Sequence, residues 1–332
     1  ANTNLTFGSF HIDIAPIIIV AFFTTLLVFG TKIGARVDGA MTVLKIAIVF
    51  FVVIVGFFYV KASNFTPFIP PSQPASTVEG SSAVTGVMTQ PLWQFATGMT
   101  PSVYGVPGIL SGAALVFFAF IGFDVVATAS EETKNPHKNV PLGIGVGMLL
   151  IIVMYMLVAV VTTGMVSYAD LAKQDSPSLA TAFELVGADW AAKIISFGIV
   201  LGLATVVMVL LLGLTRIVFA MSRDGLLPRG LSKTGKHGTP AALQIVVGAV
   251  VALVAAFFDI GVLSDMVNIG TLSAFTLVAI SIPIMRKKRP DLPRAFKMPG
   301  SPWIPILIAV ANFWLMLNLS VLTWIRFVVW LV

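Results

Sequence analysis

Long hydrophobic runs separated by short polar segments dominate the chain. Runs of about 20 apolar residues are long enough to cross a bilayer as helices. The pattern therefore predicts an all-α, polytopic membrane protein that forms a single domain over residues 1–332, with about nine spans. The expected spans are residues 15–30, 39–60, 108–130, 142–166, 191–221, 241–258, 267–285 and 303–319, and a ninth that begins near Trp324 and is truncated.

One of these runs contains two features that hydrocarbon does not tolerate. Segment 117–136, FFAFIGFDVVATASEETKNP, has Gly122 within apolar sequence and Asp124 near its middle. Freed backbone groups and carboxylates occur at membrane depth only where a bundle interior or a water-filled cavity satisfies them. We therefore predict that this helix unwinds around Gly122 beside a binding site.

Composition excludes a soluble protein and offers no support for an enzyme. Hydrophobic residues make up 58% of the chain and charged residues 10%. The absence of cysteine excludes disulfides, thiolate metal sites and thiol nucleophiles. The three histidines fall in expected loops without metal-ligand spacing, and no phosphate-binding or nucleophile-elbow motif is present. We expect no metal and no cofactor.

The positive charge is arranged as in a multi-pass membrane protein. Basic residues gather in alternate loops, which the positive-inside rule places in the cytoplasm. The intervening loops, 61–107, 167–190 and 259–266, carry only Lys61 and Lys173. Nucleic-acid binding explains the net charge of +6 poorly, because no soluble face interleaves basic and aromatic residues.

Two of the outer loops have recognisable character. Loop 61–107 is long, almost uncharged and rich in Pro, Ser, Gly and Thr, which favours an exposed excursion over a domain with its own core. The sequence of loop 167–190 predicts a short helix with Asp175 or Ser176 as N-cap and Pro177 in its first turn.

Lys45 is a charged residue inside an expected span. A lysine at the centre of a membrane helix costs about 2.5–3.5 kcal/mol on insertion scales, so it needs a reason. One reason is snorkelling, because Lys45 lies six residues, about 9 Å, beyond Gly39. The other is proton exchange, because a lysine held away from water can release its proton in the physiological range.

Asp124 and the aromatic residues before it also allow two interpretations. Asp124 either stabilises the helix break by accepting hydrogen bonds from backbone amides or takes part in recognition and proton movement. The aromatic residues either form ordinary bundle core or line and gate a pocket, and their position beside the break favours the gate. They are Phe117, Phe118, Phe120 and Phe123.

Three stretches, 117–141, 213–228 and 269–300, carry a family resemblance. In them the chain resembles the amino acid, polyamine and organocation transporter superfamily, and more closely its bacterial cationic amino acid transporter branch. The resemblance implies a five-plus-five inverted-repeat transporter fold with a discontinuous helix. It also implies an incomplete chain, an internal fragment with family helices four to eleven and the start of helix twelve.

The resemblance further implies a substrate site. In the family, helices one and six are unwound at mid-membrane and share the substrate, so the broken segment here would hold the substrate ammonium on its carbonyls, with Phe118 as aromatic gate. Leu203 would line the side-chain end of the pocket. The Gly-rich break that would hold the carboxylate belongs to helix one, outside this sequence. The implied substrate-binding residues are Phe118, Ala119, Phe120, Ile121, Gly122, Phe123 and Leu203.

The resemblance also favours proton coupling. Lys45 falls where proton-coupled relatives place a lysine and sodium-coupled relatives a second sodium ion. Sodium prefers several hard oxygens, whereas Ala204 and Thr205 provide one hydroxyl. We therefore assign Lys45, Asp124 and Thr205 to proton coupling.

The expected function is proton-coupled amino acid symport by alternating access in the cytoplasmic membrane. The expected substrates are cationic or small neutral amino acids, and the other partners are protons and lipid. The alternatives are an amino acid exchanger without proton coupling and, in another class, a channel or a membrane-embedded enzyme. A channel would need a continuous polar path and an enzyme a nucleophile, base or metal set, and the sequence shows neither.

Overall fold

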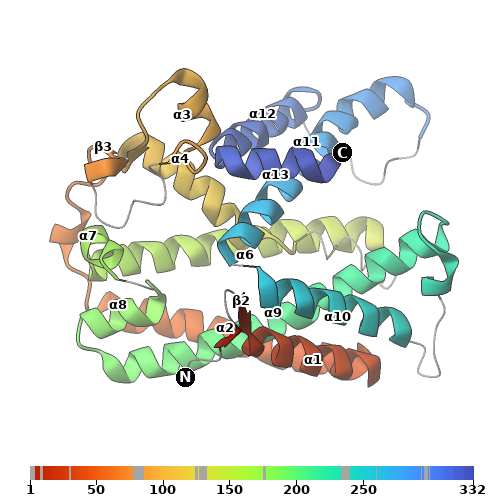
Figure 1. Ribbon diagram of the computed structural model, residues 1–332, viewed down its shortest axis with the longest axis horizontal. Helices are drawn as coiled ribbons and strands as arrows, with labels where there is room; N and C mark the ends of the chain where they lie inside the picture. Colours follow the sequence, from red (N-terminus) through yellow and green to blue (C-terminus); the bar gives the residue numbers. More distant parts are fainter. Residues whose placement is uncertain are drawn as a thin grey trace. The chain divides into compact units, whose positions relative to one another are not determined.

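The computed structural model describes residues 4–7, 10–29, 31–77, 86–123, 126, 133–174, 177–232, 240–258, 260–292, 294, 298 and 300–332. Its described part is mostly helical (Figure 1). The chain divides into two compact units, and the expectation of a single domain stays a prediction. The first unit contains Ala1–Phe65, Asp124–Glu132 and Val146–Asp259, and the second contains Thr66–Phe123, Thr133–Gly145 and Ile260–Val332.

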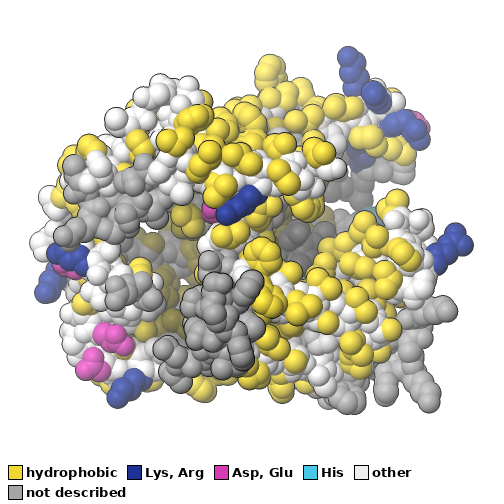
Figure 2. Space-filling model, in the orientation of Figure 1, with side chains coloured by type: hydrophobic (Ala, Val, Ile, Leu, Met, Phe, Trp, Pro, Cys, Tyr) yellow, Lys and Arg dark blue, Asp and Glu magenta, His cyan; other side chains and the backbone are white. Residues whose placement is uncertain are grey.

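Each expected span contains a helix within its described residues. Four are long and apolar enough to cross a bilayer: Gly39–Phe57 within α2 (Thr31–Phe57), α6 (Pro136–Met165), α9 (Asp189–Arg223) and α11 (Ile260–Lys288). The shorter apolar helices are α1 (Ile14–Phe29), α4 (Gly105–Val116) with the 3-10 turn η4 (Phe117–Phe120), α10 (Ala241–Phe257), α12 (Trp303–Leu317) and α13 (Val321–Leu331). Hydrophobic side chains cover much of the face drawn in Figure 2, as expected for surfaces that meet lipid. The prediction of an all-α, multi-pass membrane protein is confirmed.

One predicted helix start is wrong. Helix α11 begins at Ile260 rather than 267, and the Asp265 carboxylate in its first turns has a partner, because it accepts a hydrogen bond from Thr323 Oγ1 at 3.1 Å. Helix α13 begins at Val321, near the predicted Trp324, where the Ser320 side chain caps it by accepting from the Thr323 amide.

In the first unit, α1 packs through one stripe of its surface. Val20, Phe23 and Leu27 recur at spacings of three and four residues, which places them on one helix face. All three are buried with residues of α9 and α10, and Figure 1 shows these helices side by side. The α9 and α10 partners are Met208, Leu211, Leu243 and Val247.

Helices α2 and α9 approach closely because α9 presents small residues to α2. A Cβ built on Gly198 would lie 3.0 Å from Cγ2 and 3.1 Å from Cγ1 of Ile48, so a side chain there would force Ile48 to move. Farther along the same helix pair, the rings of Phe51 and Trp190 meet edge to face at 5.8 Å. Small residues that let backbones approach are the usual basis of helix packing in membranes.

Replacing Gly198 by valine is therefore expected to destabilise the protein by about 1–3 kcal/mol through overpacking against Ile48. The melting temperature of the purified full-length protein measures this. Gly147→Val on α6 is the matched control, because no described atom lies within 4 Å of a Cβ at Gly147. Equal melting temperatures for the two variants would contradict the predicted contact.

The second outer loop contains two short helices, α7 (Tyr168–Ala172) and α8 (Leu179–Leu185). The short helix was predicted, but its N-cap is Ser178, whose side chain accepts from the Thr181 amide at 3.2 Å. The predicted caps, Asp175 and Ser176, lie outside the described residues. Phe183 of α8 is fully buried in a core with α2, α6 and α9, so this helix is held firmly to the first unit.

In the second unit, α11 packs against α4, α12 and α13. The shared core contains Ala114, Ile269, Leu272, Met316 and Phe327. Through Ala114, this core supports helix α4, which continues into the 3-10 turn η4.

The long loop before α4 is folded onto this unit rather than extended. It contains η1 (Ala62–Phe65), which belongs to the first unit, β3 (Gln73–Pro74), η2 (Ala75–Thr77), α3 (Leu92–Thr97) and β4 (Ser102–Val103), and β3 pairs with β4 antiparallel. The Leu92 amide donates to the Leu319 carbonyl at 3.0 Å, and the Val321 amide donates to the Gln90 carbonyl at 3.1 Å. The loop is thus tied to the turn between α12 and α13, and most of its described residues are exposed or half-buried, as expected for an exposed excursion. The remaining short elements are β1 (Asn4–Phe7), β2 (Phe10–Asp13) and η6 (Arg229–Ser232).

Candidate functional site

The helix that contains the predicted break does end there. Helix α4 stops at Val116, η4 continues as a 3-10 turn, and Ile121 is extended with ψ of 137°. Gly122 then has φ of 117°, a backbone conformation that side chains disfavour. The predicted unwinding around Gly122 is confirmed. Apart from Val126, the rest of the expected span, including Asp124, lies outside the described residues.

Backbone conformation, not crowding, requires a glycine at position 122. No atom of the described residues lies within 4 Å of a Cβ built there. A residue with a Cβ nevertheless disfavours a φ of 117°. Gly122 therefore redirects the chain at the point where the helix stops.

A residue that sequence reasoning missed supports the break from α11. The ring of Phe275 lies 6.1 Å from that of Phe117 and 5.2 Å from that of Phe123, so it contacts aromatic residues on both sides of Gly122. Phe275 occurs in one of the stretches that carry the resemblance, where it follows the small residues Ser273 and Ala274. The change from small side chains to a large ring was the only feature of the sequence that marked Phe275.

The predicted site residues fall into two groups. Phe118, Ala119, Phe120, Ile121, Gly122 and Phe123 lie in the second unit. Lys45, Leu203 and Thr205 lie in the first unit, on α2 and α9. The first group is contiguous in the chain, whereas in the second the structure connects Lys45 and Thr205 through Gly202 and leaves Leu203 exposed.

In the first unit, Lys45 lies against α9 at Gly202. A Cβ on Gly202 would lie 3.8 Å from Cγ and 3.9 Å from Cε of Lys45, so the lysine stem runs across the bare backbone of Gly202. The Thr205 hydroxyl is almost fully buried and donates to the Gly202 carbonyl at 2.9 Å. Lys45, Gly202 and Thr205 thus form one contact set.

This contact set lies well inside α9. Gly202 is 13 residues after Asp189 and 21 before Arg223, distances of about 20 and 32 Å at the helical rise. Leu203, the next residue, is 62% exposed in this unit.

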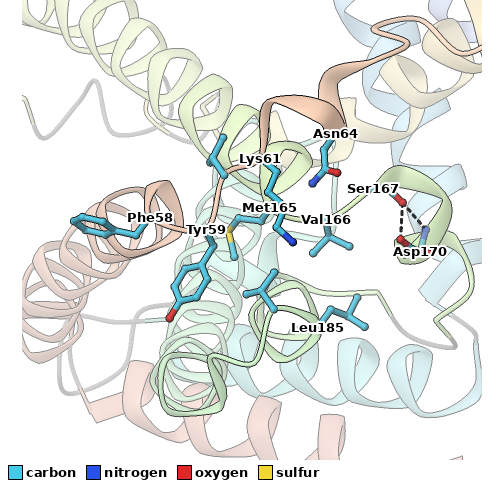
Figure 3. A pocket seen from close by; sticks show the side chains of 11 residues that line it. Phe58, Tyr59, Lys61, Asn64, Met165, Val166, Ser167, Asp170 and Leu185 are labelled. Carbon is cyan, nitrogen blue, oxygen red and sulfur yellow. Dashed lines mark hydrogen bonds between the residues drawn. The ribbon is translucent and has the colours of Figure 1, made fainter.

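A pocket of about 510 Å³ opens at another place in the first unit. We name it the Lys61 pocket (Figure 3). Its walls come from the ends of α2, α6 and α8 and from the start of α7, so it is separate from the predicted site residues. It is lined by Phe58, Tyr59, Val60, Lys61, Asn64, Met165, Val166, Ser167, Asp170, Leu185 and Val186.

Among the described residues no group of three His, Asp or Glu side chains is placed to hold a metal ion. The candidate chemistry of the described site therefore consists of backbone, aromatic rings, one hydroxyl and one ammonium.

Comparison with known proteins places the chain in a family. The family profile described as amino acid permease matches residues 3–330. The chain belongs to the amino acid permease family. This agrees with the predicted superfamily, with a helical transporter fold and with the expectation that the chain is not an enzyme.

Individual relatives of this chain carry different substrate names. The chain is 41% identical to the branched-chain amino acid permease BcaP of Bacillus subtilis (strain 168), over 98% of this chain and 63% of that protein. It is 38% identical to the methylthioribose transporter of the same organism, over 95% of this chain and 61% of that protein. It is 34% identical to the vacuolar cationic amino acid transporter 4 of Arabidopsis thaliana, over 84% of this chain and 42% of that protein. The chain thus spans less than two thirds of the length of these relatives.

Proposed function

We propose that the full-length protein is a secondary active amino acid transporter of the cytoplasmic membrane that imports its substrate with protons by alternating access. The observation that carries this proposal is the unwound segment at η4 and Gly122 in a member of the amino acid permease family. Transporters of this general type bind substrates at interrupted helices, where helix ends and backbone carbonyls meet the ligand.

The unwound segment is the proposed position of the substrate ammonium. Beyond the 3-10 turn, the extended Ile121 and the positive φ of Gly122 direct successive peptide groups away from the helix axis. Carbonyl groups so directed attract a cation without a formal negative charge. Phe118, 45% exposed in its unit, is the proposed aromatic gate.

The proposed substrate is a neutral amino acid with a small or branched apolar side chain, ahead of a cationic one. The family resemblance assigns Leu203 to the side-chain end of the site, and leucine provides no acidic partner for a guanidinium or ammonium. Relatives named for branched-chain substrates support the same choice, while those named for cationic substrates keep arginine and lysine as the second candidates.

Proton coupling is assigned to Lys45, with Thr205 and Asp124 as partners in the same step. The contact of the Lys45 stem with Gly202, about 20 Å into α9, supports a lysine held at depth. Because the Thr205 hydroxyl donates its hydrogen bond to the Gly202 carbonyl, the lone pairs of its oxygen face other groups as acceptors.

Transport by the full-length protein in proteoliposomes tests this function. Uptake of radiolabelled L-leucine is expected to saturate, to discriminate against D-leucine and to show counterflow from vesicles preloaded with unlabelled leucine. An imposed pH gradient, acid outside, is expected to drive accumulation that a protonophore abolishes. L-arginine is expected to compete weakly.

Each alternative gives a different result in the same assay. Uptake that depends on internal amino acid and ignores the pH gradient would indicate an exchanger. Flux that does not saturate and shows no counterflow would indicate a channel. Both results would contradict the proposal.

A further inference from the structure

The Lys61 pocket has the size of a small-molecule site. Its volume of about 510 Å³ falls within the range of such sites, about 300–1,000 Å³. Its wall is polar and apolar in about equal parts. Phe58, Met165, Val166, Leu185 and Val186 contribute the apolar part, and Lys61, Asn64, Ser167 and Asp170 contribute polar groups.

Lys61 supplies the cation of this pocket. Figure 3 shows its side chain extending into the space beside Met165, Val166 and Leu185, with the nitrogen at its end. The backbone beneath it is fixed, because the Lys61 amide and Asn64 Nδ2 both donate to the Gly164 carbonyl, at 2.9 and 2.8 Å. A side chain at Gly164 would collide with Val60 and Phe65, so the close approach depends on glycine.

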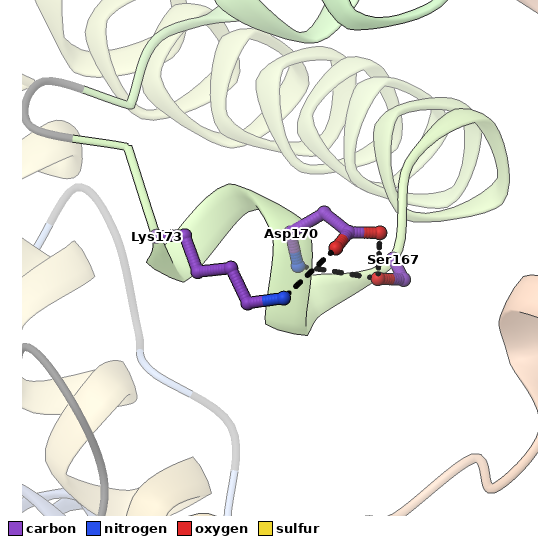
Figure 4. Close-up of polar contacts among 3 residues, drawn as sticks. All are labelled: Ser167, Asp170 and Lys173. Atoms are coloured by element: carbon purple, nitrogen blue, oxygen red, sulfur yellow. Dashed lines mark hydrogen bonds and ion pairs between the residues drawn. The ribbon is translucent and has the colours of Figure 1, made fainter.

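The negative charge of Asp170, the acidic residue of the lining, is already paired with Lys173. The Ser167 hydroxyl donates to Oδ2 at 2.7 Å, and the Lys173 ammonium donates to Oδ1 at 3.5 Å (Figure 4). These two hydrogen bonds, Ser167 first and Lys173 second, hold the pKa of Asp170 below its usual range. The carboxylate is therefore ionised at neutral pH and paired with Lys173, which leaves the charge of Lys61 in excess.

We propose that the Lys61 pocket binds a small carboxylate with an apolar body, whose carboxylate meets the Lys61 ammonium and whose body lies against Met165, Val166 and Leu185. A carboxylate pairs with a lysine through charge-assisted hydrogen bonds. A free amino acid and a simple carboxylic acid share this chemistry. In an amino acid, the α-ammonium would additionally meet the lone pairs that Asp170 keeps, since a carboxylate has about four acceptor positions.

This site goes beyond the proposed transport function and does not depend on it. It uses none of the residues assigned to transport, and its location at the ends of α2 and α6 places it outside the cell by the positive-inside rule. It would be filled from solution without any transport step.

A thiol-labelling experiment tests the site directly. Leu185→Cys is made in the full-length protein with any other cysteines replaced, and the purified protein is modified with an anionic sulfonatoethyl or a cationic trimethylammonioethyl methanethiosulfonate. The anionic reagent is expected to react faster than the cationic one. Lys61→Met is expected to slow the anionic reagent about sixfold and to speed the cationic one about sixfold, the effect of one charge at about 4 Å in water, so this rate ratio should fall roughly 30-fold.

Ligands are then tested as protectors of the same thiol. Both 4-methylpentanoate and L-leucine are expected to slow modification, and Lys61→Met is expected to abolish their protection. Stronger protection by L-leucine would support contact of its ammonium with Asp170. The 4-methylpentanoate measurement separates this pocket from the transport site, because that compound lacks the ammonium that the unwound segment would bind.

Two variants make the result interpretable. Lys61→Arg keeps the charge and is expected to retain both the rate ratio and the protection, which excludes misfolding as the cause of the Lys61→Met effect. Lys193→Met removes an exposed charge of α9 that does not line the pocket and is expected to change neither. Protection that survives Lys61→Met, or no protection by either compound in the Leu185→Cys protein, would overturn the proposal.

Discussion

Lys45→Met is expected to abolish proton-driven accumulation by the full-length protein. Methionine keeps the length and the apolar stem that packs on Gly202, but it has no proton to exchange. With one proton per substrate, a pH gradient of about one unit corresponds to about 1.4 kcal/mol, or a roughly tenfold accumulation of amino acid. In the variant the accumulation ratio should fall to about one, the value set by equilibration alone.

The measurement is steady-state uptake of L-leucine into proteoliposomes with and without the imposed pH gradient. Exchange of internal for external leucine should continue in Lys45→Met, because the substrate contacts are unchanged. Lys45→Arg should also lose accumulation, because a guanidinium remains protonated at every relevant pH. Lys193→Met on the exposed face of α9 is the matched control and should accumulate normally. A tenfold accumulation by Lys45→Met would show that Lys45 has no part in proton coupling.

The helical membrane architecture and the position of the break were predictable from sequence. Apolar run length determines where a helix can span a bilayer, and that signal is local. The break at Gly122 was predictable for a related reason, because a glycine in an apolar run beside a carboxylate is costly unless the chain unwinds. Lys45 was visible as a charge within a span, which is likewise a local property.

Features that depend on a distant partner were not predictable. Asp265 lowers the hydropathy of 259–266, so this segment was predicted to be a loop, yet its hydrogen bond with Thr323, 58 residues later, allows α11 to begin at Ile260. The contact of Phe275 with both sides of the break needs the packing of α11 against α4. The placement of Lys45 on Gly202 similarly needs the pairing of α2 with α9, which no pattern within either helix specifies.

The Lys61 pocket was also not predictable from the sequence. Its lining comes from three segments far apart in sequence, and in each of them the residues resemble ordinary ends of apolar helices. Lys61 was noted in the sequence only because it interrupts a poorly charged loop. Tertiary structure converts it into the cation of a cavity.

Gly122→Ala is expected to reduce transport strongly although the added methyl group meets no described atom within 4 Å. The cause is the backbone, because a φ of 117° costs a residue with a Cβ about 1–3 kcal/mol. If the unwound conformation is the one that binds substrate, a penalty of this size lowers its population by about 5- to 150-fold. The initial rate of leucine uptake, normalised to the amount of reconstituted protein, should fall within that range.

Gly112→Ala provides a matched control in the same unit. Gly112 lies within the regular part of α4, and a Cβ there also meets no described atom within 4 Å. The two substitutions therefore add the same methyl group to equally open space and differ in backbone conformation. Alanine in a regular helix is favourable by up to about 1 kcal/mol relative to glycine, so Gly112→Ala should retain its uptake rate and its melting temperature. Equal uptake by the two variants would show that the conformation at Gly122 has no part in transport.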